Sequence, residues 1–339
     1  MNANPEIPPY EEPTQYFNYG AGELRDIKKP IKPPMREEAI ATRLAALRDA
    51  GMKPLAMANE AALEVNTLGA WINGRRESEV TKALSDWLMG IDDEITELEG
   101  GFVMTPTSAR IVKSVEQARA PRGKEERRGV SLIYGASGTG KSETAKWMAR
   151  MDENVVYVLA DGQCRKYVSL LQAVAEENHG YGGLPAAGEK MREYIISHFP
   201  PGSLLIFDHA QLIPLSVMEQ LLVFPDEHGI ALAFVGNTQG YSKLMNAKMA
   251  QITSRVGAYT LIEIPGEEDI DALLEAWGVA GRPERKFCMM IGRQDGGLRY
   301  LDAAVREARK LAIATGTQKL DARLLKLGAV NAGCWGGAE

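Results

Sequence analysis

Residues 135–142 read GASGTGKS, a glycine-rich segment that ends in a lysine and a hydroxyl side chain. Glycine lets the backbone turn so that successive N–H groups point inward, where they can bind phosphate oxygens. Lys141 supplies a positive charge for the outer phosphates, and the Ser142 hydroxyl is a ligand for Mg²⁺. The segment therefore predicts a site for a nucleotide with Mg²⁺. The residues expected around the phosphates are Gly135, Ala136, Ser137, Gly138, Thr139, Gly140, Lys141, Ser142 and Glu143.

A second segment, SLLIFDHAQLI, has an apolar run from Leu204 to Phe207 that ends in Asp208. A carboxylate at the carboxyl end of a core strand, beside a phosphate-binding loop, holds Mg²⁺ and its water shell. The expected metal ligands are therefore Ser142 and Asp208. Asn237 ends the apolar run IALAFVGN in the same way.

A sheet must position these side chains. Apolar runs at 131–134, 155–160, 204–207, 230–237 and 259–265 predict five strands, with helical segments between them. Such an alternation predicts a mainly parallel sheet that is covered on both faces. From Glu267 onwards the spacing predicts four helices, which we expect to form a small lid. The predicted fold class is α/β: a P-loop domain with a five-stranded, mainly parallel sheet and a helical lid, preceded by an all-α domain.

That all-α domain is predicted over residues 35–90. A first helix ends at Gly51, two short helices follow around a tight turn, and a supporting helix covers SEVTKALSDWLMG. This is the order of a helix-turn-helix, whose second helix enters the DNA major groove. A helical bundle for protein contacts stays an alternative, because acidic residues offset the basic ones. On the first interpretation Leu55, Ala58, Leu63, Val65, Leu68, Trp71 and Ile72 pack inside, and Asn66, Thr67, Asn73, Arg75 and Arg76 face outward.

A connector with one amphipathic helix is expected over residues 91–129. Ile111 and Val115 lie on the apolar side of that helix. They either cover the adenine base of a nucleotide or pack the helix against the sheet, and the sequence leaves both interpretations open. Residues 1–34 and 331–339 are expected to be flexible tails, because few of their residues could repay the entropy of ordering.

The bulk composition excludes several classes of protein. The 339 residues exceed what one compact core usually absorbs, and no apolar run is long enough to span a membrane. Three distant cysteines and four scattered histidines predict neither a disulfide framework nor a zinc site. The N-terminus lacks a signal-peptide pattern. Since the net charge is −6, any DNA binding must come from local basic patches.

Five motifs stand in order along the chain: GASGTGKS, LLIFDHAQ, FVGN, SRVG and GGLR. Together they resemble an AAA+ ATPase, and most closely the transposition protein B family of phage Mu with its Tn7-type target-selection relatives. DHAQ, VGN followed by Tyr241, and QITSRVG are the more family-specific pieces. The resemblance covers about Thr105 to Leu327, and the helix-turn-helix fits it too. It implies an AAA+ core at 130–266 and a lid at 267–330.

The resemblance also implies roles for single residues, with ATP and Mg²⁺ as cofactors. Asp208 holds Mg²⁺, and Asn237 is sensor 1, which orients the attacking water. Arg255 resembles the arginine finger that reaches the γ-phosphate of a neighbouring subunit, although a surface ion pair is the alternative. Arg299 in GGLR resembles sensor 2, with a helix-cap arginine as the alternative. These roles suit phosphoryl transfer, which requires charge stabilisation more than covalent chemistry.

His209 departs from the family pattern, in which a Glu follows the Walker B Asp and polarises the attacking water. A neutral imidazole can accept a proton from water but lacks the charge of a carboxylate. We therefore expect slow ATP hydrolysis. The alternative is a protein that uses ATP as an assembly switch and hardly turns it over.

Members of the resembled family form helical filaments on duplex DNA with little sequence preference. The resemblance implies duplex DNA, a transposase and further copies of the chain as partners, in the cytoplasm of a bacterial host and away from membranes. Binding of this kind needs Lys and Arg side chains that face phosphates. The expected DNA-binding residues are Arg165, Lys166, Lys243, Lys248, Arg75 and Arg76.

The leading hypothesis is an ATP-dependent, largely sequence-nonspecific DNA-binding AAA+ protein. It oligomerises on target DNA and delivers that DNA to a transposase, which stimulates transposition. A helicase loader or replication initiator is the second hypothesis, and an ATP-sensing helix-turn-helix transcription regulator is the third. A neighbouring transposase gene favours the first, a replicative helicase partner the second, and a palindromic footprint the third.

Overall fold

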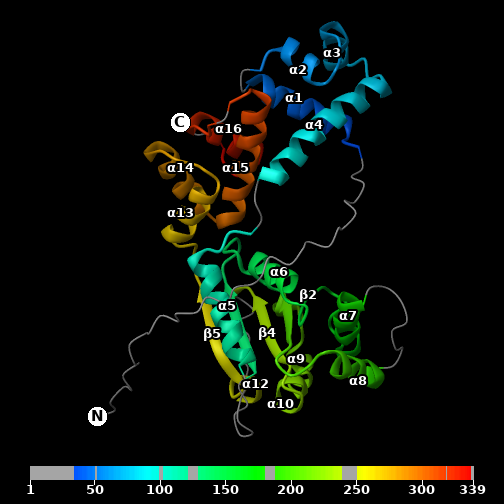
Figure 1. Ribbon diagram of the computed structural model, residues 1–339, viewed down its shortest axis with the longest axis vertical. Helices are drawn as coiled ribbons and strands as arrows, with labels where there is room; N and C mark the ends of the chain where they lie inside the picture. The colour runs from blue at the N-terminus through cyan, green and yellow to red at the C-terminus, as the bar shows by residue number, and fades with distance from the viewer. Residues whose placement is uncertain are drawn as a thin grey trace. The chain divides into compact units, whose positions relative to one another are not determined.

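The computed structural model describes residues 34–49, 52–98, 102–120, 129–179, 188–238, 250–317 and 319–336 (Figure 1). Within these ranges, helices precede and follow a central α/β region. The N-terminal helices are α1 (Glu37–Asp49), α2 (Pro54–Glu60), α3 (Val65–Ile72) and α4 (Ser78–Leu98). The C-terminal helices are α13 (Glu267–Ala276), α14 (Arg282–Gly292), α15 (Gly297–Ala314) and α16 (Ala322–Asn331).

Five parallel strands form the sheet of the central region, in the order β2-β3-β4-β1-β5. They are β1 (Val130–Gly135), β2 (Val155–Leu159), β3 (Leu204–Asp208), β4 (Ala231–Gly236) and β5 (Val256–Ile262). Because parallel strands end at one edge, β1, β3 and β4 bring the P-loop, Asp208 and Asn237 to the same edge. The predicted α/β class with a five-stranded sheet is confirmed.

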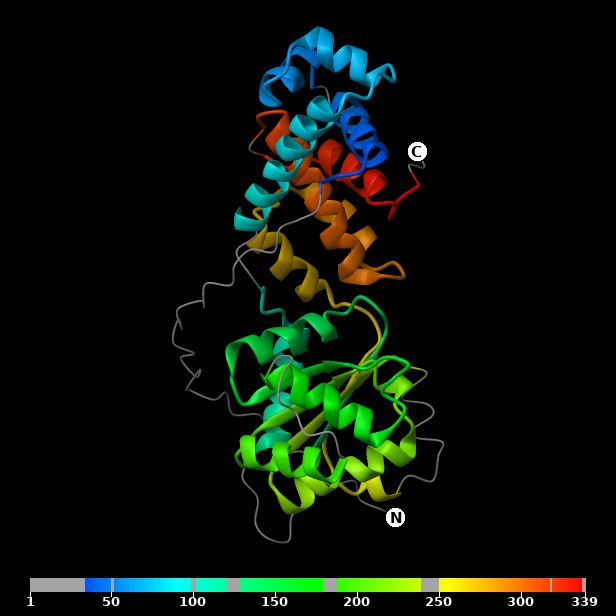
Figure 2. The ribbon, with the colours of Figure 1, turned by 90° about the vertical axis from the view of Figure 1, so that its right-hand side faces the viewer.

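Helices cover both faces of this sheet, and successive strand residues alternate between the two cores. Leu204 and Ile206 pack with α5 (Pro106–Arg119) and α6 (Lys141–Met151), whereas Leu205 and Phe207 point to the other side. There they pack against α7 (Tyr167–His179), α8 (Gly188–His198), α9 (Leu215–Leu221) and α10 (Val223–Glu227). Figures 1 and 2 show these two helical layers with the strands between them. Two short helices complete the region, η1 (Ala210–Leu212) and α12 (Ala250–Thr253).

The fifth strand begins and ends earlier than the expected range of 259–265. It covers Val256–Ile262, because Val256 pairs with Val130 and Ile262 with Gly135 along β1. The length of its single neighbour β1 sets these limits. The predicted run 259–265 continues for three residues beyond this pairing.

The two short N-terminal helices α2 and α3 are joined by a tight turn, as expected, but their buried face differs from the predicted one. Ala58, Leu68 and Trp71 are buried as predicted. Leu55, Val65 and Ile72 were expected inside and are 58%, 38% and 45% exposed, so this assignment was wrong. Helices of two turns leave the periodicity too short to define one face. Met57 and Ala61 complete the core instead.

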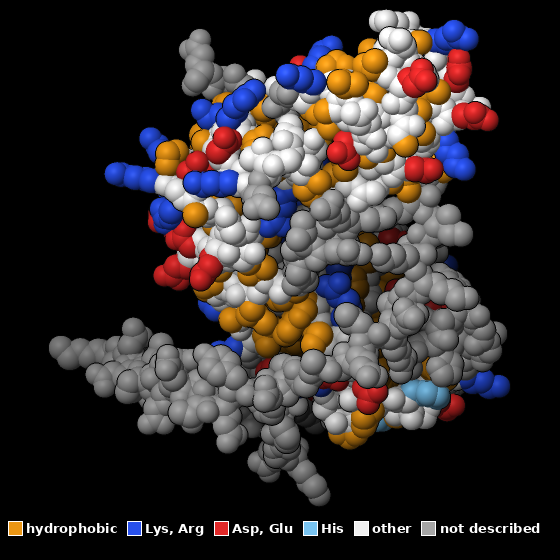
Figure 3. Space-filling view, turned by 45° about the horizontal axis from the view of Figure 1, so that its top comes forward, with side chains coloured by type: hydrophobic (Ala, Val, Ile, Leu, Met, Phe, Trp, Pro, Cys, Tyr) orange, Lys and Arg blue, Asp and Glu red, His pale blue; other side chains and the backbone are white. Residues whose placement is uncertain are grey.

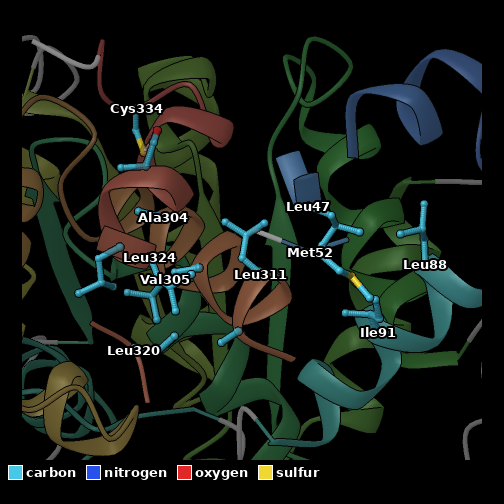
Figure 4. Close-up of a cluster of buried hydrophobic side chains, with 14 of the residues drawn as sticks. Leu47, Met52, Leu88, Ile91, Ala304, Val305, Leu311, Leu320, Leu324 and Cys334 are labelled. Carbon is cyan, nitrogen blue, oxygen red and sulfur yellow. Dashed lines mark hydrogen bonds between the residues drawn. The ribbon is translucent and has the colours of Figure 1, made fainter. Parts of the chain in front are cut away.

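The C-terminal helices and the N-terminal helices share one hydrophobic core. Figure 4 shows its side chains, among them Leu47, Met52 and Leu88 from the N-terminal helices and their connections, with Leu311 and Leu324 from the lid. Helix α15 contacts both α1 and α4. The N-terminal helices are therefore packed on the lid helices through apolar contact.

Candidate functional site

The P-loop lies between β1 and α6, and its backbone depends on glycine. Gly138 and Gly140 have φ of 73° and 84°, a left-handed conformation that other residues rarely adopt. Gly135 has no room for a side chain, because an added Cβ would lie 2.0 Å from the Ile262 carbonyl oxygen. Ala136 N–H donates to that same oxygen at 2.9 Å. The loop is thus anchored on β5 before it turns into α6.

Lys141, the first residue of α6, is buried within the loop that precedes it. Its Nζ donates to the carbonyl oxygens of Gly135 and Ala136 at 3.2 and 2.5 Å, and to Thr139 Oγ1 at 3.0 Å. Burial lowers the pKa of Lys141 to about 8. The negative charge of Asp208 raises this pKa and the positive charge of Arg299 lowers it, so both side chains act on the P-loop lysine.

Asp208, at the end of β3, is 2% exposed, and two donors hold its carboxylate. Oδ2 accepts a hydrogen bond from the Tyr157 hydroxyl at 2.9 Å, and Oδ1 accepts one from the His209 N–H at 2.8 Å. Burial raises the pKa of Tyr157, and the Asp208 charge raises it further, so the phenol stays a donor. No local motif marks Tyr157 in the sequence. Its position opposite Ile206 in the β2–β3 pairing is a tertiary feature.

His209 is exposed and takes a left-handed backbone conformation, with φ of 54° and ψ of 38°. It is one of two non-glycine residues with positive φ in the described chain, the other being Ala62. Two residues later, Gln211 turns back toward β4. Its Oε1 accepts a hydrogen bond from the Asn237 N–H at 3.3 Å. Gln211 therefore connects the turn after Asp208 to Asn237, a contact that the motif DHAQ did not reveal by itself.

The lid reaches the P-loop through the GGLR segment at the start of α15. Leu298 N–H donates to the Gly138 carbonyl oxygen at 2.7 Å. The backbones meet so closely that a Cβ on Gly138 would lie 1.8 Å from the Gly296 oxygen. Arg299, one residue further on, is exposed toward the same cavity. This contact joins segments that are far apart in the sequence.

The base of the lid is tied to α5 by a buried carboxylate. Asp269, in the first turn of α13, is 2% exposed. It accepts hydrogen bonds from Thr107 N and Thr107 Oγ1 at 2.7 and 2.6 Å, and from Gly266 N at 2.9 Å. A carboxylate at the N-termini of two helices is favoured by the dipoles of both. Asp269 therefore joins the lid to the core beside the cavity.

These elements enclose a cavity of about 800 Å³. Its lining combines the P-loop, the ends of β3 and β4, the lid, and the segment at the start of α5. The P-loop and α6 contribute Gly135, Ser137, Gly138, Thr139, Gly140, Lys141, Ser142, Glu143 and Arg150; the strand ends contribute Asp208, His209, Gln211, Gly236 and Asn237. The lid contributes Leu273, Trp277, Leu298, Arg299, Asp302 and Arg306, and the segment at α5 contributes Phe102, Val103, Thr105 and Ser108.

This lining suits a nucleotide with Mg²⁺. Ser142 and Asp208 present hydroxyl and carboxylate oxygens, the donors that Mg²⁺ prefers, and Mg²⁺ commonly completes its ligands with phosphates. In the described residues no group of three His, Cys, Asp or Glu side chains could hold a metal alone. Phe102, which lines the cavity, stacks on Trp147 with ring centroids 5.0 Å apart. Ile111 and Val115 are each 1% exposed and pack in the core, so they do not cover a base.

Arg255 is the one expected catalytic residue that does not line the cavity. It lies just before β5, and its Nε donates to Asp226 Oδ2 at 2.6 Å. The cavity does bring together the other five expected residues, namely Lys141, Asp208, His209, Asn237 and Arg299. Ala136, which was expected at the phosphates, does not line the cavity. Its N–H donates to Ile262 in β5, and its carbonyl oxygen accepts a hydrogen bond from Lys141 Nζ.

The expected DNA-binding residues fall into three groups. Arg165 and Lys166 are exposed in the turn after β2, at the sheet edge that carries the P-loop. Lys243 and Lys248 lie outside the described residues. Arg75 pairs with Glu77 at 2.8 Å, and Arg76 stacks 3.7 Å above the Trp71 ring, so contacts within the domain engage both. On the face that Figure 3 shows, Lys and Arg side chains are interspersed with Asp and Glu.

Comparison with known proteins identifies two regions. Residues 254–327 match the family described as Mu B transposition protein, C terminal, and residues 124–245 match an AAA domain. The two matched regions follow one another along the chain, the AAA match first. The resemblance to the transposition protein B family, which the five motifs predicted, is thereby confirmed.

Two relatives extend the likeness over most of the chain. The Mu-like prophage FluMu DNA transposition protein B of Haemophilus influenzae is 26% identical over 267 residues, which are 75% of this chain and 91% of that protein. The ATP-dependent target DNA activator B of Escherichia phage Mu is 25% identical over 266 residues, which are 76% of this chain and 83% of that protein.

A solved structure supports the fold. The ORC2 protein of Aeropyrum pernix, in its ADPNP–ADP complexes, aligns with a TM-score of 0.50 and 16% identity over 67% of each chain. At this identity the likeness concerns the fold alone. None of the described helices has the length and apolar character that crossing a membrane requires.

Proposed function

We propose that this protein binds ATP with Mg²⁺, oligomerises on duplex DNA with little sequence preference, and delivers that DNA to a transposase. The observation that carries the proposal is the shared cavity of P-loop, Asp208, Asn237 and lid. Relatives that are named as a transposition protein and a target DNA activator support a role in transposition. The likeness to ORC2 concerns the fold alone and does not favour a replication initiator.

Each group around the cavity has a role in this proposal. Lys141 and the loop N–H groups bind the phosphates, and Ser142 and Asp208 hold Mg²⁺, which neutralises developing charge when bound. Asn237 orients the attacking water, and Arg299 contacts the phosphates from the lid. Because Leu298 already binds Gly138, a nucleotide there makes contacts with the core and the lid at once.

Arg255 acts in a neighbouring subunit in this proposal, and its place outside the cavity agrees with such a role. An arginine supplied in trans makes hydrolysis depend on assembly. His209 stands where a carboxylate base is usual, so turnover is slow and ATP mainly stabilises the assembled state. The exposed Arg165 and Lys166 are the proposed DNA contacts among the described residues.

The N-terminal helices have a less direct part in DNA binding. The proposed helix-turn-helix would read DNA through α3, yet its two arginines are engaged with Glu77 and Trp71. Its exposed surface includes the apolar side chains Leu55 and Ile72. We therefore assign nonspecific DNA binding to the ATPase core. Arg75 and Arg76, which follow α3, are assigned only a supporting contact with DNA.

Electron microscopy of the protein with duplex DNA, with and without ATP, tests the proposal. Filaments or rings that form only with ATP are the expected result, and the Lys141→Ala variant should form none. A protein that stays monomeric with ATP and DNA would refute the proposal. Adding the transposase then tests delivery, since strand transfer into the bound DNA should increase only with ATP present.

A further inference from the structure

Arg255 lies at the edge of the sheet opposite to the P-loop. Its carbonyl oxygen accepts a hydrogen bond from Val130 N at 3.1 Å, where β1 begins, whereas the P-loop follows Gly135 at the other end of that strand. A strand of this length spans about 20 Å. That is further than an arginine side chain reaches, so Arg255 can act on a nucleotide only in another copy of the chain.

The side chain of Arg255 is held by Asp226 on α10. Nε donates to Oδ2 at 2.6 Å, and the two side chains are only 19% and 15% exposed. Nε is the guanidinium nitrogen nearest to the backbone, so this bond fixes the stem of the side chain. The forked end of a guanidinium is the part that recognises phosphate with two parallel bonds.

Stability alone does not account for such an ion pair. Removing two charges from water costs about as much as their attraction returns, and apolar pairs of similar size often serve a fold equally well. The ion pair does fix the direction in which the Arg255 side chain points. The backbone of Arg255 is held by Val130 and by a bond from its own N–H to Ile252 O at 2.9 Å, and Asp226 then fixes the side chain.

We propose that Asp226 is a positioning residue that aims Arg255 at the nucleotide of a neighbouring copy. This inference rests on the trans role proposed above and adds the group that holds the arginine. Because arginine stays charged at any accessible pH, Asp226 does not adjust its protonation. It restricts the side chain before assembly, which reduces the entropy lost on reaching the phosphate.

Mixed assemblies on duplex DNA test this inference. The Lys141→Ala chain cannot hold ATP and forms no filaments by itself, but it carries Arg255 and can join filaments of the Arg255→Ala chain. The Arg255→Ala chain holds ATP but lacks the arginine. Each alone should be nearly inactive, and their mixture should regain ATP turnover. Asp226→Asn in the Lys141→Ala chain should lower kcat of the mixture by about ten- to a hundredfold with KM unchanged, since small misplacements of a catalytic group have such effects.

The same substitution in the Arg255→Ala chain provides the control for folding, because that chain has no arginine to position. In the Arg255→Ala chain, Asp226→Asn should lower the kcat of the mixture far less. Glu227→Gln is the matched control on the same helix, where the side chain is 68% exposed. If mixing restores no turnover, the trans role of Arg255 fails. If mixing works but Asp226→Asn acts equally from both chains, or from neither, the positioning role is overturned.

Discussion

At the residue scale, Lys141 carries its charge in a buried setting. Burial lowers its pKa to about 8, so the free protein loses this proton as the pH rises through about 8. Negative phosphate oxygens favour the charged form of a nearby lysine and raise its pKa. At a pH between the pKa of Lys141 in the free protein and its higher pKa beside the phosphates, nucleotide binding must therefore be accompanied by proton uptake.

We expect proton uptake on ATP binding near pH 8.5 and almost none near pH 7, where Lys141 is already protonated. Isothermal titration calorimetry in two buffers of different ionisation enthalpy measures the uptake. The Lys141→Arg variant should show no such change with pH, because arginine stays charged. Equal uptake at both pH values in the unsubstituted protein would contradict this assignment.

His209 combines an exposed imidazole with a left-handed backbone, at φ of 54°. This conformation costs an L-residue roughly 1–2 kcal/mol, and strain of this kind persists where the position of the residue matters. His209→Gly should therefore raise the free energy of unfolding by about 1 kcal/mol. The same variant should slow ATP hydrolysis, because the imidazole is gone.

Chemical denaturation and ATP turnover measure these two effects. His209→Ala is the companion variant: it removes the imidazole but keeps a Cβ, so turnover should fall without the gain in stability. Turnover that neither substitution changes would exclude the histidine from the reaction. A His209→Gly variant that is no more stable would show that the strain is relieved elsewhere.

At the element scale, the contact between the P-loop and the start of α15 couples the lid to the nucleotide site. Gly138→Ala would place a Cβ 1.8 Å from the Gly296 oxygen, so the lid must move away. We expect faster release of a fluorescent ATP analogue, measured by stopped flow. Gly316→Ala is the matched control, because its φ of 67° is similar to the 73° of Gly138 but no atom lies within 4 Å of the added Cβ.

Backbone strain should cost each glycine variant about 1 kcal/mol of stability, and Gly138→Ala should in addition lose the lid contact. Only Gly138→Ala should change nucleotide release. If Gly316→Ala speeds release as much, the effect comes from general loosening and not from the lid contact.

At the scale of the whole molecule, the N-terminal helices and the lid share one core. Leu88 on α4 is fully buried in it. Leu88→Ala should cost about 3–5 kcal/mol, as for other buried leucines, and should lower the protection of amides in α15 as well as α4. Hydrogen exchange with mass spectrometry measures this protection.

Leu170→Ala on α7 is the control, since Leu170 is equally buried but belongs to the core of the sheet. It should lower protection around α7 and leave α15 unchanged. Loss of protection confined to α4 in the Leu88→Ala variant would mean that the N-terminal helices unfold independently. Coupled loss means that they unfold together with the lid, in which the start of α15 contacts the P-loop.

Local sequence was sufficient for the parts of the site whose geometry is local. GASGTGKS specifies its loop through glycines that adopt positive φ, and the apolar runs before Asp208 and Asn237 locate two strand ends at one sheet edge. The face of α2 and α3 was predicted less well. Leu55 and Ile72 are exposed, because two helical turns contain too few positions for the periodicity to decide which side is buried.

By itself, then, the sequence determined the α/β class, the P-loop, and the resemblance to the transposition protein B family. Only the tertiary structure placed Tyr157 on Asp208 and Asp226 on Arg255, across 51 and 29 residues of chain. It alone showed that Gly296 closes on Gly138 and that the N-terminal helices pack on the lid. The physical reason is that a hydrogen bond or close approach between distant segments depends on the strand order and helix packing, which no local spacing encodes.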